Sequence, residues 1–213
     1  MKIRSVTVGP FEENSYLVYD EATRDAVLVD PGDEPDRIIE MAESAGLEPR
    51  EIWLTHAHLD HIGGVAGVKR KWDVPVFMHP LEDLVFRRAE VAAASYGVPF
   101  EQPAYPERTL ADGDKLKVGS AEFVVWHVPG HAPGHVIFIS DSVVMGGDLL
   151  FAGSIGRVDL PLSDPRAMQR SLERLDVLAD HLVVHPGHGP STTIGREKIS
   201  NPFLSGVARP LSR

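Results

Sequence analysis

Residues 55–61 read Thr-His-Ala-His-Leu-Asp-His and directly follow a short apolar run. Four side chains that can bind a metal therefore fall within six positions. The apolar run before them predicts a buried strand, so the four ligands follow directly after the end of that strand. In extended backbone, residues two apart point to the same side, so His56 and His58 can converge on one ion. If a helix begins near Asp60, then Asp60 and His61 can face a second ion nearby. The segment therefore favours a fold that gathers metal ligands beyond the end of a strand.

Three later segments repeat this arrangement of an apolar run, a glycine-rich turn and one ligand-type residue. They are Val128-Pro129-Gly130-His131 after the apolar residues 123–126, Gly146-Gly147-Asp148 after 142–145, and Pro186-Gly187-His188-Gly189 after 182–184. Small residues in such turns let the backbone approach an ion closely. The motifs therefore predict that His131, Asp148 and His188 join the first cluster.

Together these motifs resemble the metallo-β-lactamase superfamily, and the resemblance extends from Asn14-Ser15-Tyr16 and Val29-Asp30-Pro31-Gly32 to the last ligand motif. The resemblance implies a mixed α/β (α+β) fold, the four-layer αββα sandwich, with a metal site at one edge of its two sheets. It also implies a ligand set in which His56, His58 and His131 bind one metal, Asp60, His61 and His188 bind a second, and Asp148 bridges them.

The chemistry of these ligands can also be argued without the family. Imidazoles and carboxylates suit borderline first-row ions, and the sequence has no cysteine that could supply a thiolate. Seven candidate ligands are too many for one tetrahedral ion and fit two divalent ions that share a carboxylate. Zinc is the preferred metal, with iron and manganese as alternatives. By resemblance, the ions hold a bridging hydroxide that acts as the nucleophile, with Asp60 and Asp148 as the catalytic carboxylates.

The segment from Gly147 to Arg157 resembles the glyoxalase II branch, whose members hydrolyse hydroxyacylglutathione thioesters. In that branch a basic residue after a Gly-x-Gly turn binds a glutathione carboxylate, and Arg157 occupies the matching position. The alternative is that Arg157 only pairs with Asp159, which stands where the branch often has a tyrosine. Larger members add a helical C-terminal substrate domain, but too few residues follow His188 for one. We therefore expect one domain over residues 1–213, similar to the short bacterial proteins of this branch.

The resemblance predicts a metal-dependent hydrolase that converts S-lactoylglutathione to lactate and glutathione. One alternative is an oxidoreductase similar to persulfide dioxygenases, which would hold a single iron with His56, His131 and Asp148. Another is a metallo-hydrolase with a different substrate, such as a lactone. The clean Pro-Gly-His-Gly turn around His188 favours a second metal and hence hydrolysis.

Charge and hydropathy exclude several other classes of partner. The formal net charge is −10, which argues against nucleic acid and anionic membranes, and the one basic run at 69–71 is typical of a solvated helix face. No segment approaches the roughly 18 apolar residues of a membrane span, and the first residues contain no long apolar stretch. We therefore expect a cytoplasmic enzyme that acts on a small molecule.

Apolar periodicity predicts alternating strands and helices. The expected strands cover residues 2–9, 15–19, 26–30, 51–54, 75–78, 115–118, 121–127, 135–140 and 142–146, and the expected helices cover 34–46, 64–72, 81–95 and 164–179. Prolines predict a loop at 97–107. The histidines outside the ligand motifs are expected to support the ligands or lie at the surface; they are His79, His127, His135, His181 and His185.

Overall fold

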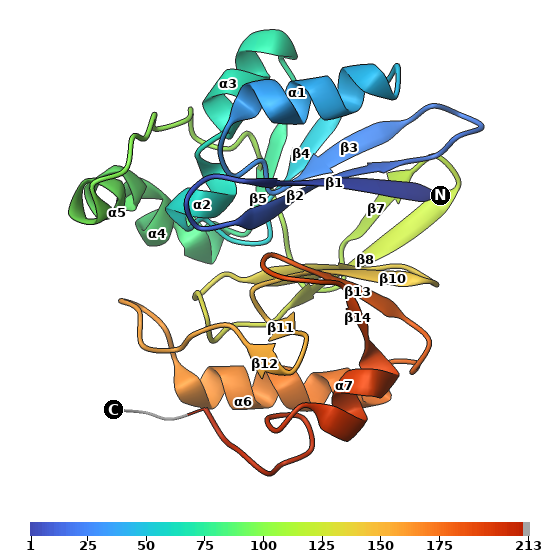
Figure 1. Cartoon of the computed structure of the whole chain (residues 1–213), viewed down its shortest axis with the longest axis vertical. Helices are drawn as coiled ribbons and strands as arrows, with labels where there is room; N and C mark the ends of the chain where they lie inside the picture. Colours follow the sequence, from blue (N-terminus) through green and yellow to red (C-terminus); the bar gives the residue numbers. More distant parts are fainter. Residues whose placement is uncertain (211–213) are drawn as a thin grey trace.

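The computed structural model describes residues 1–210, which form two six-stranded β-sheets and a short hairpin (Figure 1). In spatial order the first sheet contains β1 (Lys2–Val8), β2 (Glu13–Tyr19), β3 (Ala26–Val29), β4 (Glu51–Trp53), β5 (Val76–Met78) and β6 (Arg108–Thr109). The second contains β14 (Thr192–Thr193), β13 (Val183–Pro186), β10 (Val143–Gly147), β9 (Val136–Ile139), β8 (Ala121–His127) and β7 (Lys115–Val118). The hairpin pairs β11 (Leu150–Phe151) with β12 (Ser154–Ile155).

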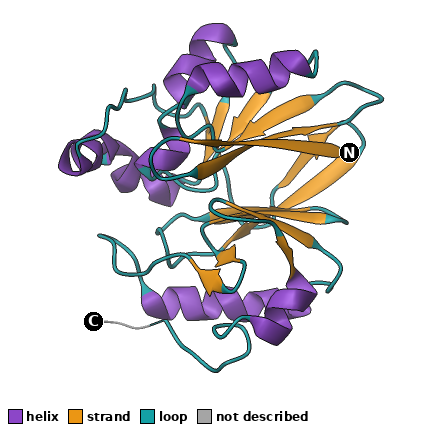
Figure 2. Cartoon of the chain, in the orientation of Figure 1, coloured by secondary structure: helices purple, strands orange, loops and turns teal. Residues whose placement is uncertain are grey.

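Helices cover the outer face of each sheet (Figure 2). The first group is α1 (Pro35–Ser44), α2 (Leu59–Ile62), α3 (Val65–Lys71), the short 3-10 helix η1 (Pro80–Glu82), α4 (Asp83–Arg87) and α5 (Ala89–Tyr96). The second group is α6 (Pro165–Glu173), the 3-10 helix η2 (Arg174–Val177) and α7 (Ile194–Ser200). The order of layers is therefore helix, sheet, sheet, helix, as expected from the sequence.

The alternation of side chains along the central strands explains this layering. In β2 and β4, Leu17 and Ile52 pack in the cluster beneath α1 and α3, whereas Val18 and Trp53 belong to the cluster between the sheets. Successive side chains of a strand point to opposite faces, so a strand buried on both faces has to be apolar throughout. Trp53 fills the centre of the inter-sheet core, where its ring lies 5.2 Å from that of Phe138 in the other sheet.

The predicted ligand motifs follow strands that end at one edge of the two sheets. In the first sheet β3, β4, β5 and β6 run parallel, and the first ligand motif follows β4. In the second sheet β10 pairs in parallel with β13, so Asp148 and His188 leave the sheet at the same end. Loops at the carboxyl ends of parallel strands lie together, which brings residues distant in sequence to one place.

Most predicted elements are present with ends shifted by one to three residues, and two differ more. The helix expected at 81–95 is divided into η1, α4 and α5, with the junction at Arg88, where φ is −99° and ψ is 0°. The helix expected at 164–179 ends in the 3-10 turns of η2. Residues 83–96 and 166–177 contain no glycine or proline, so no residue of these types indicates where either helix is interrupted. Helix α7 was not predicted; the Thr193 hydroxyl caps it by accepting a hydrogen bond from the Arg196 N–H.

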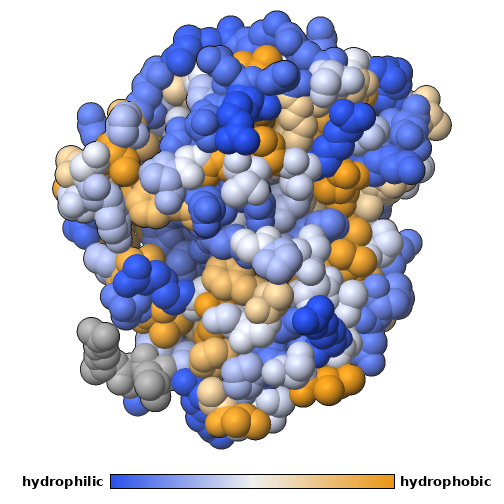
Figure 3. Space-filling view, in the orientation of Figure 1, coloured by the Kyte–Doolittle hydropathy of each residue, from blue (hydrophilic) through white to orange (hydrophobic). Residues whose placement is uncertain are grey.

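Hydrophilic side chains cover most of the face that Figure 3 shows, with smaller apolar patches between them. Over residues 1–210, the helices are all too short or too polar to cross a bilayer.

Candidate metal centre

Three histidines from two loops form the first of two clusters that contain the predicted ligands at the edge of the sheets. A third group, of Asp30, His56 and His61, shares one residue with each cluster. One ring nitrogen from each of His56, His58 and His131 lies within 4.8 Å of the other two. The closest pair is His58 Nδ1 and His131 Nε2, which are 2.8 Å apart. His56, three residues after the end of β4, is fully buried, and His131 is 3% exposed. Three imidazoles converging on one point are the ligand set of a zinc or iron ion.

The second cluster combines Asp60 and His61 of the 55–61 motif with His188 of the Pro-Gly-His-Gly turn. Atoms of Asp60, His61 and His188 lie within 4.8 Å of one another, and His188 Nε2 is 3.3 Å from Asp60 Oδ2. The short helix α2 begins at Leu59, so Asp60 and His61 lie on a helical turn after the extended segment of His56 and His58, and the ring centroids of His61 and His56 remain 4.0 Å apart. This confirms the helical turn that the sequence suggested.

Asp148 lies between the clusters, and its carboxylate is close to residues of both. Its Oδ1 is 3.4 Å from His61 Nε2, and its Oδ2 is 3.4 Å from His131 Nε2 and 3.6 Å from His188 Nε2. The residue is 6% exposed. The structure therefore brings all seven candidate ligands together, with Asp148 between the two clusters.

Hydrogen bonds fix the orientation of most of these imidazoles. The Nδ1 atoms of His131 and His188 lie 2.8 Å from the Arg157 carbonyl and 3.0 Å from the Phe11 carbonyl. A carbonyl only accepts, so both Nδ1 atoms carry the proton and both Nε2 atoms keep their lone pair for a metal. His61 Nδ1 lies 3.0 Å from Asp30 Oδ2, which leaves its Nε2 facing Asp148.

Buried polar atoms without partners show that the residues fit bound cations. Among residues 1–210, His56 Nε2, His61 Nε2 and Asp148 Oδ1 are fully buried and make no hydrogen bond. A buried polar atom without a partner costs roughly 1–3 kcal/mol, and more for a charged group. All three atoms belong to the predicted ligand set and point into the centre, where metal coordination would satisfy them.

Burial and neighbouring charges set the protonation states of the candidate ligands. Burial alone would raise the pKa of Asp148, but the imidazoles of His61 and His131 outweigh it and hold the pKa well below its usual value. Burial lowers the pKa of His58 to about 3 and also lowers that of His56. Burial would also lower the pKa values of His61 and His188, but Asp148 and Asp60 raise them. Metal binding requires ionised carboxylates and neutral imidazoles, so a metal has to displace protons mainly from the second cluster.

These shifts predict how the stability of the metal-free protein depends on pH. Burial lowers the pKa values of four imidazoles at the centre, those of His56, His58, His131 and His135. Below pH of about 6.5 the unfolded chain protonates them while the folded chain does not, so the unfolded state binds more protons. Each imidazole then removes about 1.4 kcal/mol of unfolding free energy per pH unit. Burial raises the pKa values of Glu13 and Glu82, and the carboxylates of Asp148 and Asp60 raise those of His61 and His188, so these four groups act in the opposite direction. Their opposition weakens below pH of about 5.5, where the unfolded chain also protonates the two histidines and part of the glutamates.

We therefore expect the urea midpoint of chelator-treated protein to be clearly lower at pH 4.5 than at pH 5.5. Urea unfolding of the same preparation at both values measures this. An equal or higher midpoint at pH 4.5 would contradict the burial of four neutral imidazoles.

Two carboxylates beside the ligands hold the loops in place. The Asp30 carboxylate accepts hydrogen bonds from the Thr55 N–H and hydroxyl at 2.7 and 2.6 Å and also contacts His61. The Glu82 carboxylate is fully buried and accepts from the Ala57 N–H and the Gly134 N–H, at 2.8 and 2.6 Å, which joins the loop of His56 and His58 to that of His131. Sequence reasoning missed Glu82, because nothing near it resembles a ligand motif, and it noted Asp30 only as part of the Val29-Asp30-Pro31-Gly32 segment.

His135 also supports the ligands, which is one of the two roles expected for the histidines outside the ligand motifs; the other is a place at the surface. It is fully buried, and its Nε2 accepts a hydrogen bond from the Asp148 N–H at 2.9 Å. The others lie outside the ligand clusters: His79 stacks on His127 with ring centroids 4.2 Å apart, His185 contacts Tyr16, and His181 is exposed near the Asp141 carbonyl.

A cleft of about 620 Å³ opens directly onto the candidate ligands. Its floor contains His58, Asp60, Asp148 and His188, while the walls come from α4, α5 and the loop after β12. The volume falls in the range of roughly 300–1,000 Å³ that is typical of small-molecule sites. Arg157 lines the cleft, as the sequence suggested, but its guanidinium binds both oxygens of Asp159, at 2.8 and 3.1 Å. The ion pair that was the alternative role of Arg157 is therefore present.

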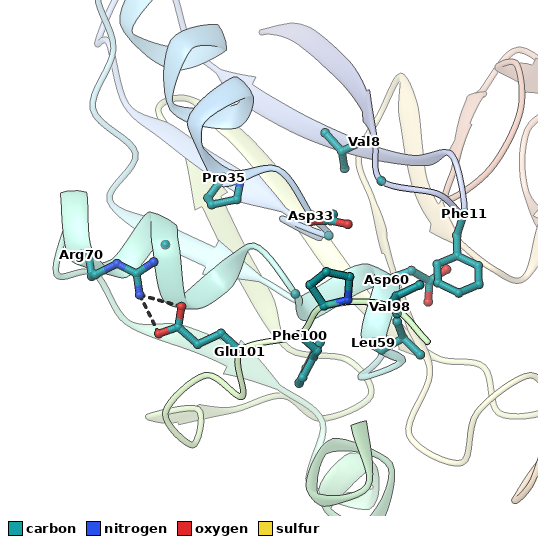
Figure 4. Close-up of a pocket in the computed structure, with 15 residues that line it drawn as sticks. Val8, Phe11, Asp33, Pro35, Leu59, Asp60, Arg70, Val98, Phe100 and Glu101 are labelled. Carbon is teal, nitrogen blue, oxygen red and sulfur yellow. Dashed lines mark hydrogen bonds and ion pairs between the residues drawn. The ribbon is translucent and has the colours of Figure 1, made fainter. Parts of the chain in front are cut away.

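A smaller cavity of about 300 Å³ lies beside this cleft and shares Phe11, Leu59 and Asp60 with it. Figure 4 shows these three residues at one end and Arg70 at the other. Glu101 binds the Arg70 guanidinium through both oxygens, at 2.6 and 2.8 Å, so this cation is already neutralised.

Comparison with known proteins agrees with this geometry. The family model of the metallo-beta-lactamase superfamily matches residues 8–193. The chain belongs to this superfamily. Its two sheets, outer helices and ligand loops are thus a metallo-β-lactamase fold, which confirms the predicted fold class.

Three similar proteins of the superfamily bear on the site. Hydroxyacylglutathione hydrolase GloC of Haemophilus influenzae is 36% identical over 96% of this chain and 99% of its own length. The crystal structure of TTHA1623 in a di-iron-bound form is 47% identical, with a TM-score of 0.88 over 94% of this chain and 100% of that one. ETHE1 from Myxococcus xanthus is 28% identical, with a TM-score of 0.80 over 97% of this chain and 85% of that one.

Proposed function

We propose that this metallo-β-lactamase-fold protein is a dinuclear metal-dependent hydrolase of thioesters, with glutathione thioesters such as S-lactoylglutathione as substrates. The observation that carries the proposal is the division of seven ligands into two clusters joined by Asp148. The similarity to a hydroxyacylglutathione hydrolase over nearly the full length supports the thioester as substrate, and the di-iron-bound relative supports two metals.

The proposed ligands are His56, His58 and His131 for one ion and Asp60, His61 and His188 for the other, with Asp148 shared. Two divalent ions at such a site, zinc preferred and iron or manganese as alternatives, supply an activated water near neutral pH and stabilise negative charge on the carbonyl oxygen. In the net reaction water adds across the C–S bond, so that the acyl carbon gains the hydroxyl and the sulfur gains the proton.

The chain's own groups orient the ligands and handle the proton. Burial would raise the pKa of Asp60, but the hydrogen bond from His188 and the charge of His61 lower it, so Asp60 is ionised at neutral pH. Asp60 lines the cleft and can take a proton from the attacking water for transfer to the departing sulfur. Asp30 and His135 fix the orientations of His61 and the Asp148 loop, which keeps both catalytic carboxylates in place.

A panel of four substrates tests the proposal. Metal-loaded protein is assayed with S-lactoylglutathione, a β-lactam, an acyl-homoserine lactone and a phosphodiester. We expect turnover of the thioester, with kcat/KM at least about tenfold above that for any other class. Turnover of another class without thioester turnover would contradict the proposal.

A second candidate function is an oxidoreductase of the persulfide dioxygenase type with one iron. The observation that favours it concerns the expected iron ligands: His56 and His131 lie in one cluster, and Asp148 Oδ2 is 3.4 Å from His131 Nε2. The similarity to ETHE1 is consistent with it. The convergence of Asp60, His61 and His188 favours two metals instead. One iron per chain, together with oxygen consumption on glutathione persulfide, would select the oxidoreductase.

A further inference from the structure

One face of α4 and α5 forms an apolar wall of the cleft that opens onto the metal centre. Val85, Ala89 and Ala92 recur at helical spacing along this wall, and Ser95 and Tyr96 extend it. Across the cleft lie Phe151 and Ile155 of the hairpin and the apolar loop residues 160–162. Figure 1 shows α5 on the same side of the molecule as the loop that follows β12.

Arg88 lies on the same helical face, at the junction of α4 and α5, and lines the cleft. The other arginine of the cleft, Arg157, is already neutralised, because it binds both oxygens of Asp159. Arg70, in the adjoining smaller cavity, binds both oxygens of Glu101. Within residues 1–210, the Arg88 guanidinium makes neither a hydrogen bond nor an ion pair, so it is the cleft's available cation. In a chain of net charge −10, an anionic substrate requires a local cation of this kind.

We infer that the substrate is a thioester with an apolar acyl group and a carboxylate on its thiol portion, and that Arg88, rather than Arg157, binds that carboxylate. The inference rests on the proposed thioester hydrolysis and specifies its substrate. A guanidinium binds a carboxylate through two parallel hydrogen bonds, and such charge-assisted bonds raise affinity by about tenfold or more. The apolar side chains of α5 and the facing loop then surround the acyl group, which favours acyl chains over the small hydroxylated lactoyl group.

Two matched thioesters test the carboxylate contact. S-hexanoyl-N-acetylcysteine and S-hexanoyl-N-acetylcysteamine have the same acyl group and differ by one carboxylate on the thiol. We expect kcat/KM to be at least about tenfold higher for the anionic compound. Arg88→Met keeps much of the side chain's apolar length but removes its charge, so the preference should fall to about one, mainly through KM.

Arg87 and Arg157 provide the controls. Arg87 is adjacent in sequence, binds Asp83 at 2.8 Å and lies over the Tyr105 ring, outside the cleft. Arg87→Met should therefore keep the wild-type preference for the anionic compound. Arg157→Met should reduce it less than Arg88→Met does, because the Arg157 guanidinium is engaged with Asp159.

A series of N-acetylcysteine thioesters tests the acyl wall. From acetyl to hexanoyl, kcat/KM should rise by up to about fourfold per methylene, since each buried methylene favours binding by that factor. S-lactoyl-N-acetylcysteine should be a poorer substrate than the hexanoyl compound.

The outcomes separate this inference from the proposed function. If wild-type protein hydrolyses both hexanoyl compounds equally well, or if Arg88→Met keeps the preference, the role of Arg88 is wrong while thioester hydrolysis stands. If the lactoyl compound is hydrolysed faster than the hexanoyl one, the apolar acyl assignment is wrong. If no thioester is hydrolysed, the proposed function itself fails.

Discussion

Asp148→Ala is expected to abolish turnover and to release at least one metal. The carboxylate is close to residues of both clusters, so under the proposed assignment its loss would remove a ligand from both ions and part of the charge that offsets them. We expect kcat to fall by about a thousandfold or more, the scale seen when a group that stabilises the transition state is removed. Because metal bound only to the folded state adds stability, the variant should also melt at a lower temperature.

Metal content by mass spectrometry, kcat and thermal unfolding measure these effects on the same preparations. Asp148→Asn separates charge from packing, because the amide keeps the shape of the side chain beside His135. Asp73→Ala, which removes a carboxylate whose side chain is 97% exposed, should change none of the three. His188→Ala, a change at a single terminal ligand, should have a smaller effect than Asp148→Ala. Two ions per chain and near-normal kcat in Asp148→Ala would contradict the shared-ligand assignment.

Gly187→Ala is expected to disrupt the centre through sterics alone. A Cβ atom at Gly187 would lie 2.2 Å from Asp148 Oδ1 and 2.7 Å from His61 Cε1. The backbone is held on both sides, because the Gly187 N–H donates to the Gly147 carbonyl and its own carbonyl accepts from the Asn14 N–H, each at 2.8 Å. Either Asp148 or the loop must therefore move, and overpacking of this kind costs roughly 1–3 kcal/mol or more. We expect loss of one metal and a fall in kcat/KM of about a hundredfold.

Gly189→Ala is the matched control two residues away. Gly189 has φ of +75°, which strains alanine by about 1–2 kcal/mol, but no atom lies within 4 Å of the added Cβ. This variant should lose stability yet keep both metals and most of its activity. Equal metal loss in the two variants would show that the loop conformation, rather than contact with Asp148 and His61, determines metal binding.

The ligand clusters were predictable because residue type, spacing and flanking strands all agreed. Histidines two apart after an apolar strand, followed by an aspartate and a histidine at a helix start, have few arrangements other than two neighbouring sites. The three later motifs each end a strand, and the parallel strands then bring His131, Asp148 and His188 to the same edge. Which residue binds which ion stays a prediction, and measurements of metal binding have to test it.

The supporting residues were not predictable, because their roles depend on packing between distant segments. Glu82 reaches the backbone of Ala57 and Gly134 only because η1 lies against both ligand loops. Arg88 lay inside an expected continuous helix, and its place in the cleft follows from how α4 and α5 meet beside the metal centre. The ion pair of Arg157 with Asp159 is one of two roles that the sequence allows, and residue types alone do not decide between them.

Stepwise metal reconstitution tests the central claim most directly. Protein stripped with a chelator is titrated with zinc while bound metal per chain and S-hexanoyl-N-acetylcysteine hydrolysis are measured together, and the titration is repeated with ferrous iron under anaerobic conditions. We predict saturation at two ions per chain, with most of the hydrolytic activity appearing as the second ion binds. Saturation at one ion, or full thioester hydrolysis with a single ion bound, would contradict the dinuclear site and the role of Asp148 as a shared ligand.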